Sequence, residues 1–372
     1  MLKNITKTFI NIFLIVFVVS ISACQVARFI FYNYSNITDH KIFPAHTLIA
    51  PSSKFTFINS STGKFPKQIE NSKKETVPFD KFLEETKSVA FLIIKNDSIQ
   101  YEKYFNGYDD KSIVASFSMA KSFTSILIGC AIQDGFIKSE DELMVNYIPE
   151  LKENGLEKIT IKHLLQMTSG INFNESYVNP FGDAATFYYG RDLRKSISKM
   201  KPQIEAGTKF NYISGNTQLL GLVLERSLKG KTITNYLQEK LWQPLGMEFD
   251  ASWSIDKKKE GLEKTFCCLN ARARDFAKIG RLYLKKGNWN GKQLVPQNWV
   301  EKSIKADTTN GGARNYKYQW WLPTKNGDFM ADGHLGQYIY VNPAKNLIIV
   351  RLGKKSGNAN WRKIFISLAQ FY

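Results

Sequence analysis

The chain has 372 residues, of which 43% are hydrophobic and 13% aromatic, so it can form one large domain or two small ones of ordinary globular composition. The formal net charge is +18, yet the lysines are spread along the chain and form no long basic block. This pattern indicates a solvated, lysine-rich surface, and we expect no nucleic-acid partner.

The N-terminus predicts export from the cytoplasm. Lys3 and Lys7 precede an uncharged run over 8–27 whose apolar centre spans 9–19. The sequence Ile-Ser-Ala-Cys over 21–24 resembles a bacterial lipobox, which predicts a signal peptide over 1–23 and lipidation of Cys24. An uncleaved anchor is the alternative, because about 20 uncharged residues can just span a bilayer. Both hypotheses place the rest of the chain in a bacterial cell envelope, outside the cytoplasm and tied to a membrane.

Three cysteines follow Cys24, namely Cys130 and the adjacent pair Cys267 and Cys268. An odd number that includes two neighbours argues against a disulfide framework, and no set of cysteines and histidines has zinc spacing. We therefore expect free, mostly buried thiols and no metal site.

The first half of the chain predicts an extension, a hairpin and a buried helix. Residues 24–78 are rich in Ser, Asn, Thr and Lys with scattered Pro, which predicts a tether or irregular extension. The folded domain is expected over 79–372. It begins with a β-hairpin over 88–94 and 98–105. An apolar helix over 120–132 follows, and Ser118 stands at its entrance.

The middle of the chain is helical in pattern, and its end returns to strands. The predicted elements are helices over 161–167, 215–228, 233–242 and 273–284, strands over 316–322, 336–341 and 347–352, and a closing helix over 361–371. This order predicts an α+β fold. One antiparallel sheet, flanked by helices, is built from both ends of the chain (79–115 and 290–372), and residues 116–289 form a mostly helical lobe.

Ser118 and Lys121 form a Ser-x-x-Lys pair. Residues three apart on a helix share one face, so the lysine amine can take the serine proton. The same spacing occurs at Ser61/Lys64, Ser196/Lys199, Ser198/Lys201 and Ser254/Lys257. Only the Ser118 pair opens an apolar helix, whose N-terminal N–H groups favour an oxyanion. The structural alternative is a capping serine beside a surface lysine.

Further motifs follow in an order that resembles the serine β-lactamase-like hydrolase family. This family includes class C β-lactamases, D-alanyl-D-alanine carboxypeptidases, esterases and nylon-oligomer hydrolases. The resemblance covers 79 to the C-terminus and rests on SMAK (118–121), HLLQMTSG (163–170), AGT (206–208), FNYIS (210–214), PLGM (244–247), LNARARD (269–275) and HLG (334–336). It implies a β-lactamase-like fold and acyl-serine chemistry without a metal or organic cofactor.

Tyr212 and Ser214 take the place of the family's Tyr-x-Asn. The resemblance implies that Tyr212 relays a proton to the leaving group, and a nearby ammonium is expected to lower its pKa. A literal Tyr-x-Asn at Tyr177 lies in a polar loop, and Tyr177 is kept as a candidate substrate-loop residue. Ser214 in place of Asn departs from the penicillin-recognising members and resembles the esterase and oligomer-hydrolase branch.

His334 and Gly336 take the place of the family's Lys-Thr-Gly, on a strand that lines the site. A literal Lys-Ser-Gly at 355–357 has no strand after it. Family geometry implies an oxyanion hole made by the backbone N–H groups of Ser118 and Gln337. His334 is expected to orient the catalytic network with Ser214, and a half-buried structural histidine is the alternative. The other histidines, His40, His46 and His163, are expected to be structural or exposed.

The sequence thus predicts an envelope-anchored serine hydrolase that cleaves an ester or amide through an acyl-serine intermediate. Its expected partners are a small molecule or short peptide with a carbonyl group, and the membrane. A D-alanyl-D-alanine carboxypeptidase or β-lactamase is one alternative. A non-catalytic envelope lipoprotein that uses the fold as a binding module is another. A Ser-His-Asp triad is not expected, because no G-x-S-x-G elbow is present.

Overall fold

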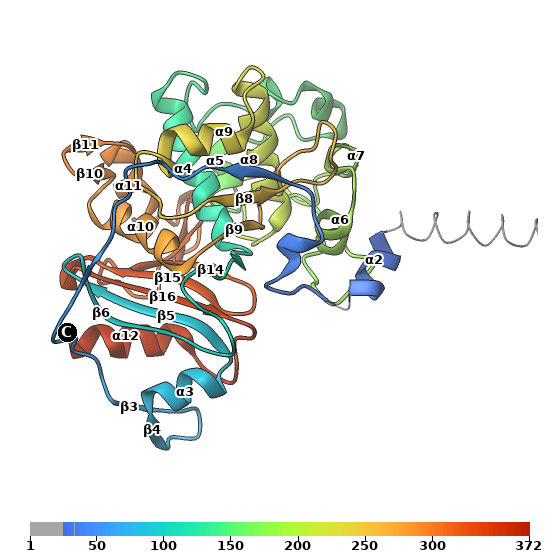
Figure 1. Cartoon of the computed structure of the whole chain (residues 1–372). Helices are drawn as coiled ribbons and strands as arrows, with labels where there is room; N and C mark the ends of the chain where they lie inside the picture. The colour runs from blue at the N-terminus through green and yellow to red at the C-terminus, as the bar shows by residue number, and fades with distance from the viewer. Residues whose placement is uncertain (1–24, 33) are drawn as a thin grey trace, which may run out of the picture.

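The computed structural model describes residues 25–32 and 34–372, so the predicted signal peptide and Cys24 lie outside the described residues. Within this described part of the chain, no helix combines the length and the apolar character needed to cross a bilayer. Two lobes are visible in Figure 1, one built on a large sheet and the other mostly on helices.

The large sheet has eight strands in the order β12-β13-β14-β15-β16-β5-β6-β2. Neighbouring strands are antiparallel except β2 and β6, which are parallel. Strands from both ends of the chain therefore share one antiparallel sheet, which confirms the predicted fold class. In sheet order the strands are Tyr316–Lys317, Trp320–Trp321, Phe329–Gly333, Gln337–Asn342, Leu347–Gly353, Ser88–Lys95, Ser98–Tyr104 and Ile58–Asn59.

Helices cover both faces of this sheet because its central strands are apolar on both sides. Phe91 of β5 packs with the helices α3 and α12, whereas Leu92 belongs to the core shared with the helical lobe. The helix α10 lies on that second face (Figure 1), where a Cβ at Gly280 would lie 2.9 Å from Ile348. These helices span Phe79–Glu85 (α3), Ala273–Leu284 (α10) and Trp361–Phe371 (α12). The sheet lobe therefore includes α10, which the sequence placed in the helical lobe.

The helical lobe surrounds α4, in which every residue over 119–131 is buried. Its sequence explains this burial, because apolar and small residues occupy all sides of the helix. The lobe also contains a four-stranded antiparallel sheet in the order β1-β8-β9-β7, which the sequence did not predict. The helices are α4 (Met119–Gln133), α5 (Ile161–Leu165), α6 (Asp183–Tyr189), α7 (Leu193–Ile197), α8 (Ser214–Ser227), α9 (Ile233–Leu237) and α11 (Gln297–Ser303), and the strands are β1 (Ala45–Leu48), β8 (Ala251–Ser254), β9 (Leu269–Ala271) and β7 (Val114–Ala115).

Residues 34–78 are folded onto both lobes, so the prediction of a tether is wrong for this part of the chain. Strand β1 pairs with β8 of the small sheet, and β2 pairs with β6 of the large sheet. Leu48 and Phe57 bury their side chains in the main core. The sequence did not predict these strands because a segment that pairs with existing sheets needs only isolated apolar residues for its own burial, and these form no periodic pattern. The same extension contributes the helix α2 (Gln25–Tyr32) and the hairpin of β3 (Gln68–Glu70) and β4 (Thr76–Pro78).

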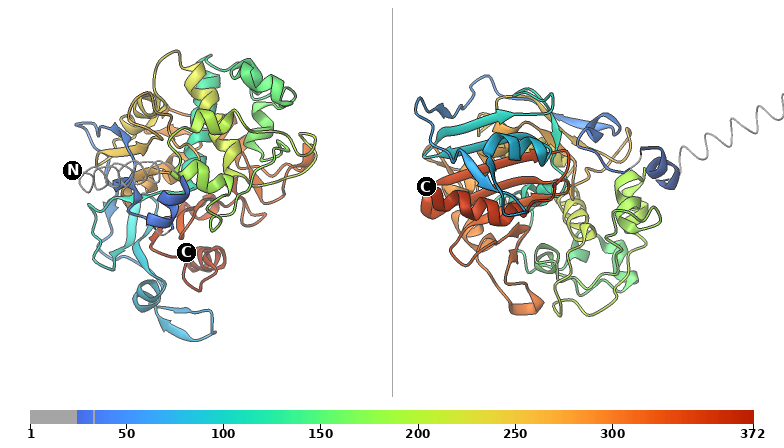
Figure 2. Two further views of the ribbon diagram at one scale, coloured as in Figure 1. Left: turned by 90° about the vertical axis from the view of Figure 1, so that its right-hand side faces the viewer. Right: turned by 90° about the horizontal axis from the view of Figure 1, so that it is seen from below.

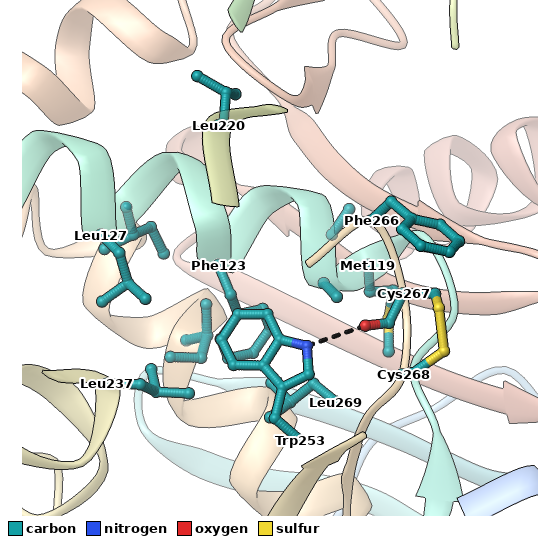
Figure 3. Packing of buried hydrophobic residues seen from close by; sticks show 14 of the residues in the cluster. Met119, Phe123, Leu127, Leu220, Leu237, Trp253, Phe266, Cys267, Cys268 and Leu269 are labelled. Atoms are coloured by element: carbon teal, nitrogen blue, oxygen red, sulfur yellow. Dashed lines mark hydrogen bonds between the residues drawn. A yellow bond between two sulfur atoms is a disulfide. The ribbon is translucent and has the colours of Figure 1, made fainter. Parts of the chain in front are cut away.

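Cys267 and Cys268 form a disulfide between neighbouring residues, so the expectation of free thiols is wrong for this pair. Cys130 is free and buried, as expected. Figure 3 shows the disulfide beside α4, where the Trp253 indole N–H donates a hydrogen bond of 3.0 Å to the Cys267 carbonyl. The prediction failed because it considered only disulfides between cysteines that are far apart in the sequence.

Candidate active site

The loop between β7 and α4 carries Ser118. The Ser116 N–H donates to the Leu269 carbonyl at 2.9 Å, so the pairing of β7 extends into this loop. Phe117 then has a φ of 45°, a left-handed conformation that is uncommon for a non-glycine residue and is concentrated at functional sites. Ser118 follows at the N-cap position, but its hydroxyl makes no capping hydrogen bond. The hydroxyl is therefore free for another role.

Lys121 is a buried lysine whose amine reaches three oxygens. Nζ donates to Ser118 Oγ at 3.1 Å, to Ser214 Oγ at 3.1 Å and to the Phe266 carbonyl at 3.0 Å. Burial lowers the pKa of Lys121 to about 8, whereas the Glu175 carboxylate raises it. About a tenth of the amine is then uncharged at pH 7. This burial excludes the surface-lysine alternative, and the neutral amine can accept the Ser118 proton.

Glu175 is a site residue that the sequence did not single out. Its carboxylate accepts hydrogen bonds from the Ser214 N–H at 2.7 Å, the Ser214 hydroxyl at 2.6 Å and the Tyr177 phenol at 2.7 Å. Because Ser214 begins α8, the carboxylate also lies at the positive end of that helix. Donation to Glu175 leaves the Ser214 oxygen free to accept from Lys121. A single glutamate in a long polar loop gave no distinctive signal in the sequence.

Two tyrosines, Tyr177 and Tyr212, lie beside Ser118. The Ser118 hydroxyl is close enough to lower the pKa of both phenols, but burial has the larger effect and raises the pKa of each well above its ordinary value. The expected lowering of the Tyr212 pKa is therefore wrong. The Lys121 amine lies over the Tyr212 ring, 5.2 Å from its centre. Tyr212 is therefore a neutral phenol. Such a phenol can still relay protons, because its oxygen can accept a proton while its own O–H proton passes to a leaving group.

The turn between β14 and β15 contacts the Ser118 loop. A Cβ at Gly333 would lie 2.3 Å from the Ser116 carbonyl and 3.1 Å from the Cβ of Gln337. Gly336 has a φ of 87°, and a Cβ there would lie 2.0 Å from Nη1 of Arg351, which donates to the Gly336 carbonyl at 2.6 Å. Glycine at 333 thus lets the turn approach the nucleophile loop, and glycine at 336 leaves room for the Arg351 guanidinium that holds the turn.

His334 lies in this turn, where two aromatic rings cover part of an otherwise exposed side chain. The centre of the imidazole lies 5.7 Å from the Phe117 ring and 5.0 Å from the Tyr177 ring. Partial burial lowers the pKa of His334, so the ring is neutral at pH 7. His334 therefore forms part of the pocket wall beside Ser118.

An apolar pocket of about 50 Å³ opens beside Ser118. Tyr177 and residues of the helix α6 line one part of it, and the N-terminal extension contributes Phe29 and Ser35. The buried Lys264 amine holds α6 by donating to the carbonyls of Phe187 and Tyr188, each at 2.9 Å. The lining residues are Phe29, Ser35, Phe117, Ser118, Tyr177, Ala184, Ala185, Tyr188, Tyr189, Ser214, Phe266, Cys267 and His334.

Four of the predicted site residues, Ser118, Tyr177, Ser214 and His334, line this pocket, although they come from distant parts of the chain. Lys121 and Tyr212 do not line it but contact the Ser118 hydroxyl. Two other histidines have local structural roles. His163 caps α5 together with Thr160, and His46 lies 2.9 Å from the Glu263 carboxylate. Glu175 and the wall supplied by α2 are the parts of the site that the sequence did not predict.

Comparison with known proteins identifies the family. The family model described as Beta-lactamase matches residues 79–369. The chain therefore belongs to the β-lactamase family of serine hydrolases, as its motifs indicated.

Individual relatives are distant. The chain is 28% identical over 294 residues to 6-aminohexanoate-dimer hydrolase of Paenarthrobacter ureafaciens, with 73% of each chain covered. It is 24% identical over 183 residues to an Escherichia coli (strain K12) protein assigned as a D-alanyl-D-alanine carboxypeptidase, covering 43% of this chain and 42% of that protein.

A Bacillus anthracis protein, assigned as a 6-aminohexanoate-dimer hydrolase, has a similar solved structure. Its TM-score is 0.79 at 24% identity, and the match covers 91% of this chain and 93% of that one. This share is too large to fall within 79–372 alone, so part of the folded N-terminal extension matches as well. At this identity the likeness establishes the fold.

Proposed function

We propose that the protein is a serine hydrolase that cleaves an ester or amide bond through an acyl-Ser118 intermediate. The observation that carries this proposal is the contact of 3.1 Å between the buried Lys121 amine, with its lowered pKa, and the Ser118 hydroxyl. The relative named 6-aminohexanoate-dimer hydrolase supports hydrolysis as the reaction class.

The proposed reaction starts with attack of Ser118 Oγ on the substrate carbonyl carbon, while Lys121 Nζ takes the hydroxyl proton. The backbone N–H groups of Ser118 and Gln337 would stabilise the resulting oxyanion. Tyr212 passes a proton to the leaving group as the intermediate collapses to the acyl-enzyme. Water then attacks the acyl carbon, the bond between this carbon and Ser118 Oγ breaks to release the carboxylic acid, and a proton from the water returns to Oγ. Ser214 positions the Lys121 amine through the hydrogen bond of 3.1 Å.

The substrate is expected to be a small carbonyl compound or short peptide, with an ester or a linear amide favoured over a β-lactam. Ser214 stands at the position of the family's asparagine. Its N–H and its hydroxyl both donate hydrogen bonds to the Glu175 carboxylate, so neither is free to donate to a substrate. Cleavage of D-alanyl-D-alanine or of a β-lactam is the second candidate, favoured by the Escherichia coli relative's assignment. Attachment to the cell envelope through Cys24 or an uncleaved anchor completes the proposal.

A fluorophosphonate probe tests the nucleophile, because it reacts covalently with an activated serine. We expect labelling of the wild type and none of Ser118→Ala. Ser198→Ala is a matched control, since Ser198 also precedes a lysine by three residues but is exposed and bonded to Lys195. Labelling of Ser118→Ala, or no labelling of intact wild type, would contradict the proposal and favour the non-catalytic binding module. Labelling by a fluorescent penicillin would favour the second candidate.

A further inference from the structure

We propose that the rim of the active-site pocket is a docking surface for a phospholipid bilayer, so that an ester or amide with an apolar acyl group enters from the lipid. The substrate class rests on the proposed function, whereas the docking surface does not. We define the apolar rim as the exposed side chains of Ile30, Phe31, Tyr34, Val178 and Phe181.

The two most exposed large hydrophobic side chains among the described residues both belong to this rim. Phe31 of α2 is 81% exposed, and Phe181, in the loop before α6, is 78% exposed. Ile30 and Val178 are exposed beside them. Isolated apolar side chains are normal on a protein surface, but a group that borders a pocket marks an interaction site.

The rim borders the pocket through its neighbours in the sequence. Phe29 and Ser35, which flank the α2 part of the rim, both line the pocket, and so does Tyr177, which directly precedes Val178. The Phe29 ring also packs on Tyr189 of α6 at 5.5 Å. The left panel of Figure 2 looks onto this face, where α2 and α6 lie side by side. Both parts of the rim therefore surround one opening.

The residue pattern of α2 requires an apolar environment on its outer side. The helix buries Arg28 and Phe29 against the protein but leaves Ile30 and Phe31 exposed. A helix that faced water on this side would carry polar residues there. The chain itself indicates that a bilayer covers this surface. The uncharged run over 8–27, which we expect to be tied to a membrane, continues into the start of α2. The net charge of +18 would add attraction to anionic lipids.

The pocket connects this face with the nucleophile, because its lining includes both Ser118 and Phe29 of α2. Between them the wall is largely apolar, with Phe117, Ala184 and Ala185 among its residues. An acyl chain could therefore extend from the carbonyl at Ser118 towards the rim without leaving an apolar environment.

Fluorescence quenching by lipid tests the docking surface. The full chain is reconstituted in phosphatidylglycerol–phosphatidylcholine vesicles with brominated acyl chains, and tryptophan is introduced as Phe31→Trp or Phe181→Trp. We expect added quenching in both variants compared with the wild type. Ile58→Trp is the matched control, because Ile58 is 70% exposed but lies on β2 of the large sheet.

Three results would overturn the docking surface. One is quenching at 31 and 181 no greater than at 58. Another is quenching at 31 alone, since proximity to an N-terminal anchor would explain it. The third is protection of both positions by self-association without quenching, which would assign the rim to a second copy of the chain.

Turnover tests the substrate class. The double variant Phe31→Ser/Phe181→Ser is expected to lower the ratio of vesicle-borne 4-nitrophenyl palmitate to soluble 4-nitrophenyl acetate hydrolysis by about tenfold. An unchanged ratio would overturn entry from the lipid. A wild type that hydrolyses neither ester would overturn the proposed function instead, while quenching, which needs no catalysis, still decides the docking surface.

Discussion

At the scale of single residues, the site depends on where one amine is buried. Lys121 donates to two hydroxyls and one carbonyl, and burial lowers its pKa to about 8. Glu175 opposes that effect and holds Ser214. A change to any of these groups should therefore alter the chemistry more than the stability.

Removal of either member of the Ser118–Lys121 pair should abolish most activity. We expect Ser118→Ala and Lys121→Ala each to lower kcat/KM for an ester by about a thousandfold or more. The nucleophile and its base act in one step, so the loss of either removes most of the rate enhancement that the pair provides. Lys199→Ala should leave the rate unchanged, since Lys199 belongs to another Ser-x-x-Lys pair and is exposed. Turnover of 4-nitrophenyl acetate gives the measurement, and near-normal turnover in Lys121→Ala would refute the base assignment.

The pH profile should follow the Lys121 amine. Because only the neutral amine accepts a proton, kcat/KM should rise with pH and level off above about 8. Glu175→Gln removes the negative charge that raises this pKa, so the rise should move to lower pH by about half a unit or more. The glutamine oxygen can still accept from Ser214. Glu153→Gln, at an exposed position elsewhere, should not move the profile. A rise that stays in place in Glu175→Gln would show that the titrating group is not Lys121.

At the scale of elements, the site depends on two turns held against each other. The left-handed Phe117 turn presents Ser118, and the β14–β15 turn approaches through Gly333. Arg351 of β16 holds the second turn, since its buried guanidinium donates to the carbonyls of Gly336, Thr86 and Lys355. It also donates to the Ser88 hydroxyl and stacks on Trp361.

Arg351→Met should therefore destabilise the protein. Several buried acceptors would lose their donor, which is expected to lower the free energy of unfolding by about 2–4 kcal/mol. Urea denaturation measures this change. Arg226→Met is the control, because Arg226 forms a surface ion pair with Glu150 and should change stability by less than about 1 kcal/mol. Equal effects of the two substitutions would contradict this role of Arg351.

At the scale of the whole molecule, the N-terminal extension joins the two lobes. Its strand β1 extends the small sheet and its strand β2 extends the large one, while α2 forms part of the pocket wall. The extension is thus part of the fold that holds the site together.

Leu48→Ala tests this role. Leu48 is 0% exposed in the main core, so its truncation should lower the free energy of unfolding by about 2–5 kcal/mol. Ile49→Ala is the adjacent control, because Ile49 is 50% exposed and should have an effect below about 1 kcal/mol. Thermal or urea unfolding distinguishes the two. No effect of Leu48→Ala would restore the interpretation of this segment as a tether.

The sequence by itself determined those features that local patterns encode. Apolar periodicity predicted α4, α8, α10 and α12, and two short strand patterns close together in the chain predicted the β5–β6 hairpin. The ordered motifs predicted the family. Ser118 and Lys121 could be paired from sequence because one helical turn separates them.

Only the tertiary structure decided the features that depend on contacts between distant residues. Glu175 joins the site because its loop folds back onto the first residue of α8, 39 residues further along the chain. The pKa of Tyr212 rises chiefly because the phenol is buried, and this effect outweighs the hydrogen bond with Ser118. Cys267 and Cys268 form a disulfide although they are adjacent in the sequence. The strands β1 and β2 pair with β8 and β6, which come from later parts of the chain. The periodicity of apolar residues along the sequence does not encode such contacts, because each contact depends on which surfaces the rest of the fold brings together.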